Sequence, residues 1–169
     1  MKYKDYTKDQ LIKIIEMYAK NWLAHDGCWF LAAEKKHGLK EAISIDKESW
    51  KRFTVIEAKR IMKEFDIQKE SGLDGLEKAL ALRLYASINI QEIERVGVSK
   101  IIFRMKTCRV QAARERKNLP LFPCKEVGIV EYSGFASTID PRIQTKVIAC
   151  PPDSLKRDFH CGWEFTISE

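Results

Sequence analysis

Five cysteines are the side chains most directly able to do chemistry: Cys28, Cys108, Cys124, Cys150 and Cys161. A thiolate is both a nucleophile and a soft metal ligand. The odd count and wide spacing argue against a disulfide framework, and the opening segment MKYKDYTKDQ lacks the apolar stretch of a secretory signal. We therefore expect free thiols in a reducing, cytoplasmic compartment.

Two of these cysteines stand at the starts of predicted helices, where the backbone dipole stabilises a thiolate. Helical spacing places Gln111 and Glu115 on the face of Cys108, and Glu131 on the face of Cys124. A thiol followed by a carboxylate one or two turns later is a candidate catalytic arrangement. The sequence thus favours Cys108, Cys124 and Glu131 as catalytic candidates.

The cysteines allow three interpretations. Cysteine is a small hydrophobe that commonly fills cores. Alternatively, Cys108, Cys124, Cys150 and Cys161 form a thiolate zinc site, although no C-x-x-C pair brings two ligands together locally. In the third interpretation, Cys108 or Cys124 is a reactive or ligand-binding thiol.

Polar residues on the apolar faces of the first helices are further candidates. His25 follows the face of Tyr18 and Trp22, and Glu57 and Arg60 form an i,i+3 pair. These residues are either a core histidine and a structural ion pair, or an acid/base with a carboxylate-binding arginine. A metal site of His25, Asp26 and Glu57 is a weaker alternative without an E-x-x-H spacing. The ligand-binding candidates are Gln111, Glu115, Arg60, Glu57 and Trp163.

The elements that must position these residues follow from hydrophobic periodicity. Thr7 and Gln10 form a capping box for a first helix, which Asp26-Gly27 interrupts and Gly38 ends. The spacing then predicts helices over 47–65 (capped by Asp46) and 73–84, strands over 85–93 and 98–107, helices over 108–118 and 124–138, and strands over 143–150 and 159–167. We expect an α+β fold, in which an N-terminal helical segment precedes β-β-α-α-β-β with a four-stranded antiparallel sheet.

The predicted domain division places an N-terminal helical region (1–72) against an α+β domain (73–169). The stripe of Tyr18, Trp22, Trp29, Trp50 and Phe53 should close the shared core, and any part left exposed favours a homodimer.

Composition narrows the class of protein. The chain has 169 residues, 45% of them hydrophobic, with a net charge of +6. No apolar run approaches the ~18–20 residues of a membrane span, so no membrane partner is expected. The basic run from Arg104 to Lys117 is typical of a solvated helix face and lacks interleaved aromatics, which makes a nucleic-acid adaptor the least favoured function. No nucleotide-binding or serine-hydrolase motif is present.

Longer motifs carry a resemblance to known families. The segments MKTCRVQAARERKNLPLFPCK, VEYSGFASTIDPRI, ACPPD and CGWEFTI, together with HDGCWF and IEAKRIM, resemble a family of small bacterial and archaeal cytosolic proteins of unknown function. This resemblance implies a cytosolic location and no activity. More distantly, Cys108, Cys124 and Cys161 are similar in placement to cysteines of the L-2-amino-thiazoline-4-carboxylate hydrolase-like family, which tends to have an acid where Val127 stands.

Together these features predict a cytoplasmic small-molecule-binding or hydrolase-like protein. Its site should lie between the sheet and the helices that begin at Cys108 and Cys124. The alternative is a non-enzymatic protein with a structural cysteine-ligated zinc site.

Overall fold

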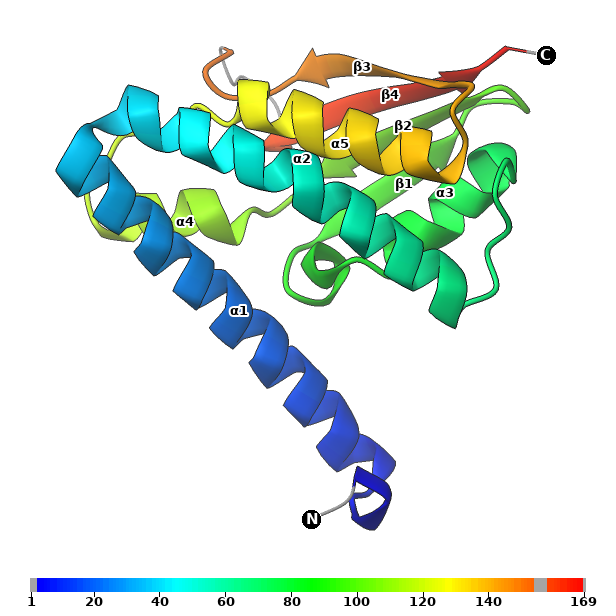
Figure 1. Cartoon of the computed structure of the whole chain (residues 1–169), viewed down its shortest axis with the longest axis horizontal. Helices are drawn as coiled ribbons and strands as arrows, with labels where there is room; N and C mark the ends of the chain where they lie inside the picture. Colours follow the sequence, from blue (N-terminus) through cyan, green and yellow to red (C-terminus); the bar gives the residue numbers. More distant parts are fainter. Residues whose placement is uncertain (1–2, 154–157, 169) are drawn as a thin grey trace.

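The computed structural model describes residues 3–153 and 158–168. In chain order the elements are η1 (Tyr3–Asp5), α1 (Lys8–His37), α2 (Leu39–Glu64), α3 (Gly72–Ala81), η2 (Leu84–Ser87), β1 (Gln91–Arg95), β2 (Lys100–Met105), α4 (Arg109–Arg116), α5 (Lys125–Ile139), β3 (Ile143–Ala149) and β4 (Cys161–Ile167). The predicted α+β class is confirmed, with a helical N-terminal part followed by a four-stranded antiparallel sheet (Figure 1).

The first helix begins at the predicted capping box and is longer than expected. Gln10 N donates to Thr7 Oγ1 at 3.2 Å, and Thr7 N donates to Gln10 Oε1 at 2.8 Å. The expected interruption at Asp26-Gly27 is wrong, because α1 continues unbroken to His37. A single helical glycine costs only about 1 kcal/mol, which a thirty-residue helix tolerates.

The start of the second helix also differs from the prediction. Gly38, with a φ of 83°, ends α1 as expected, and α2 begins directly afterwards at Leu39 rather than at Lys47. The amide of Ala42 donates to the Gly38 carbonyl at 3.1 Å, so the glycine serves both helices. Asp46 is therefore an interior residue of α2 and not its N-cap.

The predicted strand over 85–93 is wrong for most of its length. Residues Leu84–Ser87 form the short helix η2, and β1 covers only Gln91–Arg95. The amides of Ile88 and Asn89 both donate to the Tyr85 carbonyl, at 3.3 and 2.9 Å. These local turn bonds satisfy backbone groups that a strand would have paired across the sheet. The alternating polarity of this segment therefore does not mark a buried strand face, since Ile88 is buried but Ile90 is 63% exposed.

The sheet has the order β1-β2-β4-β3, with every neighbouring pair antiparallel. In the β2–β4 register, Phe103 lies opposite Trp163 and Ile101 opposite Phe165. α5 packs on this sheet and along α2, whereas α4 lies beyond one end of the strands (Figure 1). Of the two helices between the hairpins, α5 alone therefore covers the sheet.

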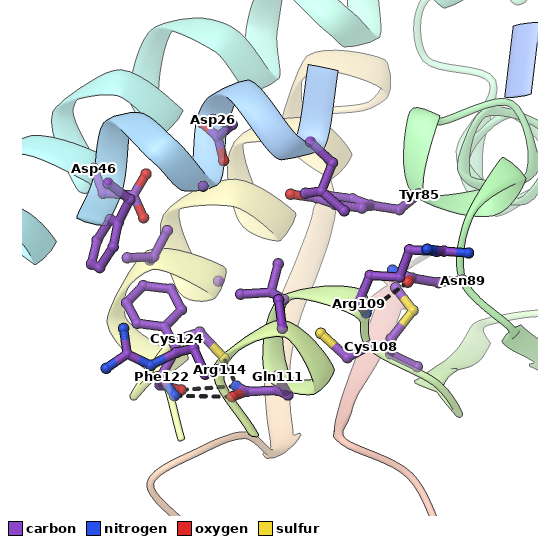
Figure 2. A pocket seen from close by; sticks show the side chains of 18 of the residues that line it. Asp26, Asp46, Tyr85, Asn89, Cys108, Arg109, Gln111, Arg114, Phe122 and Cys124 are labelled. Carbon is purple, nitrogen blue, oxygen red and sulfur yellow. Dashed lines mark hydrogen bonds between the residues drawn. The ribbon is translucent and has the colours of Figure 1, made fainter. Parts of the chain in front are cut away.

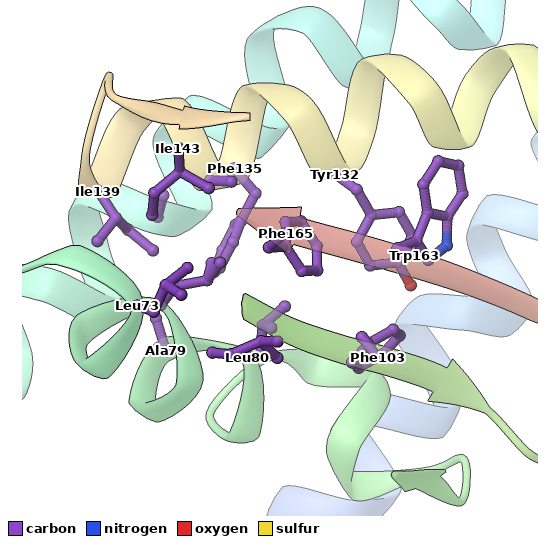
Figure 3. Close-up of a cluster of buried hydrophobic side chains, with 14 of the residues drawn as sticks. Leu73, Ala79, Leu80, Phe103, Tyr132, Phe135, Ile139, Ile143, Trp163 and Phe165 are labelled. Carbon is purple, nitrogen blue, oxygen red and sulfur yellow. The ribbon is translucent and has the colours of Figure 1, made fainter. Parts of the chain in front are cut away.

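The core lies between α5, α3 and the inner face of the sheet. Figure 3 shows Phe103, Phe135 and Phe165 meeting Tyr132 and Trp163 in this layer. The Tyr132 and Trp163 rings stack with centroids 4.6 Å apart. Packing this close requires a small residue on α5, since a Cβ at position 128 would stand 2.6 Å from Trp163 Cζ2. The sequence places Gly128 there.

The N-terminal aromatic stripe is only partly buried. Trp50 is 6% exposed, and Trp22 stacks on Phe53 with centroids 5.4 Å apart. Tyr18 and Trp29, however, are 53% and 65% exposed. The N-terminal half of α1 extends away from the body (Figure 1). The homodimer expected from such exposure stays a prediction, which the molar mass from light scattering would test.

Within residues 3–153 and 158–168, no helix combines the length and apolar character needed to cross a membrane.

Candidate functional site

A cavity of about 400 Å³ opens between the α1–α2 pair, η2, α4, α5 and one end of the sheet. Figure 2 shows its labelled side chains arriving from opposite sides. Asp26 and Asp46 project from the long helices, and Cys108 and Cys124 from the starts of α4 and α5. Most of the wall is apolar or aromatic. A largely apolar cavity of this size with a few convergent polar groups is typical of small-molecule sites.

Four cysteines that are distant in sequence meet at this cavity. Cys108 and Cys124 immediately precede α4 and α5, Cys150 follows β3, and Cys161 begins β4. All four line the cavity, and Cys28 lines it from α1. The closest described contact joins Cys124 Sγ to Cys150 Sγ at 3.5 Å. The fold therefore gathers the thiols that the sequence singled out, and adds Cys28 at an exposed position.

The two helix-terminal thiols differ in acidity. Hydrogen bonding from the Cys150 thiol lowers the pKa of Cys124, which outweighs the opposing effect of burial. Burial raises the pKa of Cys108 to about 12, despite hydrogen bonds from the backbone amides of Val110 and Gln111. The expectation that a helix start stabilises both thiolates therefore fails for Cys108, because desolvation outweighs the dipole. The hydrogen bond to Cys124 raises the pKa of Cys150, which is the opposite of its effect on Cys124.

Gln111 fixes the segment that carries Cys124. Its side-chain amide pairs with the backbone of Phe122, with Nε2 donating to the carbonyl and Oε1 accepting from the amide, both at 2.9 Å. Nε2 also lies 3.6 Å from Cys124 Sγ. Gln111 is 1% exposed, so this is a buried clamp. Glu115, predicted on the same face, is exposed and is not among the cavity-lining residues.

Glu131 lines the cavity but belongs to a buried ion-pair network. Arg83 Nη2 lies 2.7 Å from Glu131 Oε1 and 2.8 Å from Glu57 Oε2. Burial opposes the charge of Arg83, yet Glu131 and Glu57 together raise its pKa. Burial also raises the pKa of Glu131, and Arg83 offsets part of that rise. The predicted Glu57–Arg60 pair is wrong, because Arg60 is exposed on the outer face of α2 while Glu57 turns to Arg83.

The remaining sequence candidates divide into those that line the cavity and those that do not. Trp163 lines the cavity, whereas His25 is exposed and does not line it. Its neighbour Asp26 does, together with Asp46 and Tyr85. The hydroxyl of Tyr85 points toward the middle of the cavity in Figure 2. Asp26 is already a candidate from the sequence, as a possible metal ligand. Periodicity misses the other two, because it predicts Asp46 as a cap and Tyr85 as part of a strand. Arg83 was detectable in principle as a lone charge within the apolar segment ALRLY.

Among residues 3–153 and 158–168, no group of three or more His, Cys, Asp or Glu side chains is arranged to hold a metal ion. The predicted histidine–carboxylate site fails on geometry as well, since Glu57 binds Arg83 and His25 lies outside the cavity.

The basic run from Arg104 to Lys117 is largely engaged within the fold. Arg104 bonds Glu92 and Glu94, and Lys106 contacts Asp158. Arg114 is 6% exposed and forms a bidentate pair with Glu34 at 2.8 and 3.2 Å. Arg109 Nε donates to the Ile88 carbonyl at 2.9 Å. These contacts give the charges an internal structural role.

Comparison with known proteins gives a family and no activity. No curated protein and no solved structure matches the chain. The distant hydrolase resemblance is unconfirmed. The model of a family of unknown function, DUF6125, matches residues 4–167. That match covers nearly the whole chain, and the protein therefore belongs to the DUF6125 family of unknown function.

Proposed function

We propose that the protein is a small-molecule-binding, hydrolase-like enzyme whose nucleophile is Cys124. The observation that supports this most is the combination of a cavity position with a lowered pKa, caused by the thiol of Cys150 at 3.5 Å. The amide of Gln111, 3.6 Å from the same sulfur, adds a second stabilising donor. A thiolate held by two donors in a cavity is the arrangement expected of a reactive cysteine.

The chemistry would be transfer of an acyl group to water. The Cys124 thiolate attacks the acyl carbon, the C–S bond forms, and the bond to the leaving group breaks as that group takes up a proton. Water then adds to the thioester as it gives a proton back to the group that protonated the leaving group, the C–S bond breaks, and a carboxylic acid leaves with the thiolate restored. Asp46 is the candidate proton carrier, because burial and the nearby charges of Asp26 and Glu131 raise its pKa to about 7.

Trp163 supplies a further polar group. Its indole Nε1 is buried and has no hydrogen-bond partner among the described residues, while the side chain lines the cavity. Buried N–H groups without a partner are uncommon in folded proteins. A ligand oxygen at this position would satisfy it, and we assign Trp163 a ligand-binding role.

Acyl transfer to the protein tests the assignment. p-Nitrophenyl acetate serves as the probe, in a Cys28→Ala background because Cys28 is exposed. We expect a burst of one nitrophenolate per chain and one acetyl group, mapped by mass spectrometry to Cys124. Cys124→Ala should abolish the burst. Cys108→Ala is the matched control and should retain it, because a thiol with a pKa of about 12 stays protonated. A burst that survives Cys124→Ala contradicts the proposal.

The alternative is the cysteine-ligated zinc site. Four thiols share one cavity, but among residues 3–153 and 158–168 they are not arranged to hold a metal ion, so zinc binding would require them to move closer together. It predicts about one zinc ion per chain and a lower melting temperature after chelation. Elemental analysis separates the two proposals, since bound zinc would also suppress acetylation of Cys124.

A further inference from the structure

Two carboxylates from neighbouring helices face the cavity without a basic partner. Asp26 lies on α1 and Asp46 on α2, and both project from the same side in Figure 2. Both side chains are half-buried, and within the described residues no salt bridge joins either one to a lysine or arginine. Half-buried carboxylates without a counter-ion are uncommon, because desolvation penalises the charged form.

The electrostatic balance of the cavity is acidic. Burial raises the pKa of Asp26, and nearby His25 offsets only part of this rise. Burial, Asp26 and Glu131 together raise the pKa of Asp46, which a hydrogen bond from Trp50 partly counters. Two arginines of this region are buried: Arg83 is already shared between Glu57 and Glu131, and Arg114 is paired with Glu34. The cavity therefore lacks positive charge near Asp26 and Asp46.

A second observation points to a ligand. Trp163 is 1% exposed and lines the same cavity, and its buried indole Nε1 has no hydrogen-bond partner among the described residues. This N–H requires an acceptor, which a polar group of a ligand beyond its cationic end would supply. Glu131, in contrast, is already paired with Arg83 at 2.7 Å.

The aromatic walls suit a cation as well. Trp50 and Tyr85 line the cavity and stack with centroids 6.1 Å apart, and Phe30 meets Phe122 edge to face at 4.8 Å. Aromatic faces attract a cation through the ring quadrupole. The fold already uses this attraction nearby, where Arg83 lies 5.6 Å from the Tyr85 ring centroid.

Basic residues do line the cavity, but they do not favour an anion in its interior. Arg114 is held by Glu34 and Arg109 donates to a backbone carbonyl. Lys20, Arg116 and Lys117 are exposed, where water and salt screen their charge. The charge inside the cavity is therefore set mainly by its carboxylates.

The geometry points to a ligand that carries a protonated amine or amidinium, seated against Asp26 and Asp46 between the aromatic walls. This inference rests on the proposed small-molecule site and names the class of molecule it takes. The cationic group supplies the charge that the two carboxylates lack, the apolar part of the ligand lies between the aromatic walls, and its acyl oxygen extends toward Cys124 and Trp163.

Three probes of one shape but different charge test the inference: benzylamine, benzyl alcohol and benzoate. We expect isothermal titration at about pH 8, where Asp46 is ionised, to show benzylamine binding at least about tenfold more tightly than benzyl alcohol. Benzoate should bind more weakly than either. Equal binding of benzylamine and benzyl alcohol, or preference for benzoate, overturns the inference.

Variants locate the binding. Asp26→Asn/Asp46→Asn should reduce benzylamine affinity to that of benzyl alcohol, and should raise the melting temperature of the ligand-free protein because a desolvated charge pair is removed. Opposite effects on binding and stability exclude simple misfolding. Glu48→Gln is the matched control, an exposed carboxylate on the same helix that pairs with Lys51. It should leave benzylamine binding unchanged.

The acyl-transfer proposal can fail independently. Benzylamine binding that depends on Asp26 and Asp46, without any acetylation of Cys124, supports this inference and rejects the hydrolase-like mechanism. Acetylation of Cys124 without preference for the amine gives the opposite result.

Discussion

The sulfur atoms of Cys124 and Cys150 lie 3.5 Å apart, although 25 residues separate them in the chain. Cys124 stands at the start of α5 and Cys150 directly after β3, so the packing of α5 on the sheet brings them together. The hydrogen bond between them lowers the pKa of Cys124 and raises that of Cys150. These opposite shifts favour a thiolate on Cys124 with the Cys150 thiol as its hydrogen-bond donor.

This pair should be sensitive to oxidation. The Cys124 thiolate attacks hydrogen peroxide to give a sulfenic acid and hydroxide, and the Cys150 thiol then displaces water from the sulfenic acid to form a disulfide. We expect mild peroxide treatment to join Cys124 to Cys150 before any other pair, as seen by peptide mapping after alkylation. In Cys150→Ser, Cys124 should accumulate as the sulfenic acid. Preferential oxidation of Cys108 would contradict the assignment.

Buried Arg83 should contribute strongly to the free energy of unfolding. Arg83→Met leaves Glu57 and Glu131 without their cation, and breaking a buried pair in this way costs about 3–5 kcal/mol. Urea denaturation should show the loss. The control is Arg60→Met on the exposed face of α2, which should change the free energy of unfolding by less than about 0.5 kcal/mol. A larger effect at Arg60 would restore the ion pair predicted from sequence spacing.

Periodicity predicted most elements because their buried faces are regular. Phe103 and Met105 in β2, and Trp163 and Phe165 in β4, point inward as alternation requires. It failed around Tyr85, where a short helical turn alternates in polarity as a strand would, although none of the residues Leu84–Ser87 is buried. Periodicity describes one element at a time. It therefore cannot detect that Arg83, which directly precedes the turn, forms an ion pair with Glu131 on α5.

The packing of α5 on the sheet should depend on one small residue. Gly128→Ala places a methyl group 2.6 Å from Trp163 Cζ2, so either the indole or the helix must shift. Overpacking of this kind costs about 1–3 kcal/mol. Gly27→Ala is the control, since no heavy atom lies within 4 Å of the added carbon and alanine favours a helix by about 0.5–1 kcal/mol. Chemical denaturation should thus shift in opposite directions for the two variants.

The candidate site likewise contains some residues that local sequence signals predict and others that they miss. Its thiols were found from residue type and from helix starts, which are local signals. Asp26 and Asp46 reach one cavity only because α1 runs unbroken past Gly27 and α2 begins at Leu39. Glu34 and Arg114, which pair at 2.8 Å, are 80 residues apart in the sequence. Such relationships depend on how helices cross, and no spacing rule within one chain segment encodes them.

Acid should weaken the end of α5 through Asp140. This buried carboxylate accepts from Arg142 Nη2 at 2.7 Å and from the Gly72 amide at 3.0 Å. The bonds to Arg142 hold the pKa of Asp140 at about 2, below its usual value of 3.8. The folded state therefore binds this proton less readily than the unfolded chain. The stabilisation is complete above about pH 4 and disappears as the pH falls to about 2.

Comparison of Asp140→Asn with the parent protein isolates this contribution, because the other carboxylates titrate in both. We expect the variant to be less stable by about 1 kcal/mol near neutral pH, a value reduced for screening because Arg142 is half exposed. The difference in free energy of unfolding should shrink as the pH falls from about 4 to about 2. A difference that stays constant over this range would show that Asp140 acts through packing and neutral hydrogen bonds, and not through its charge.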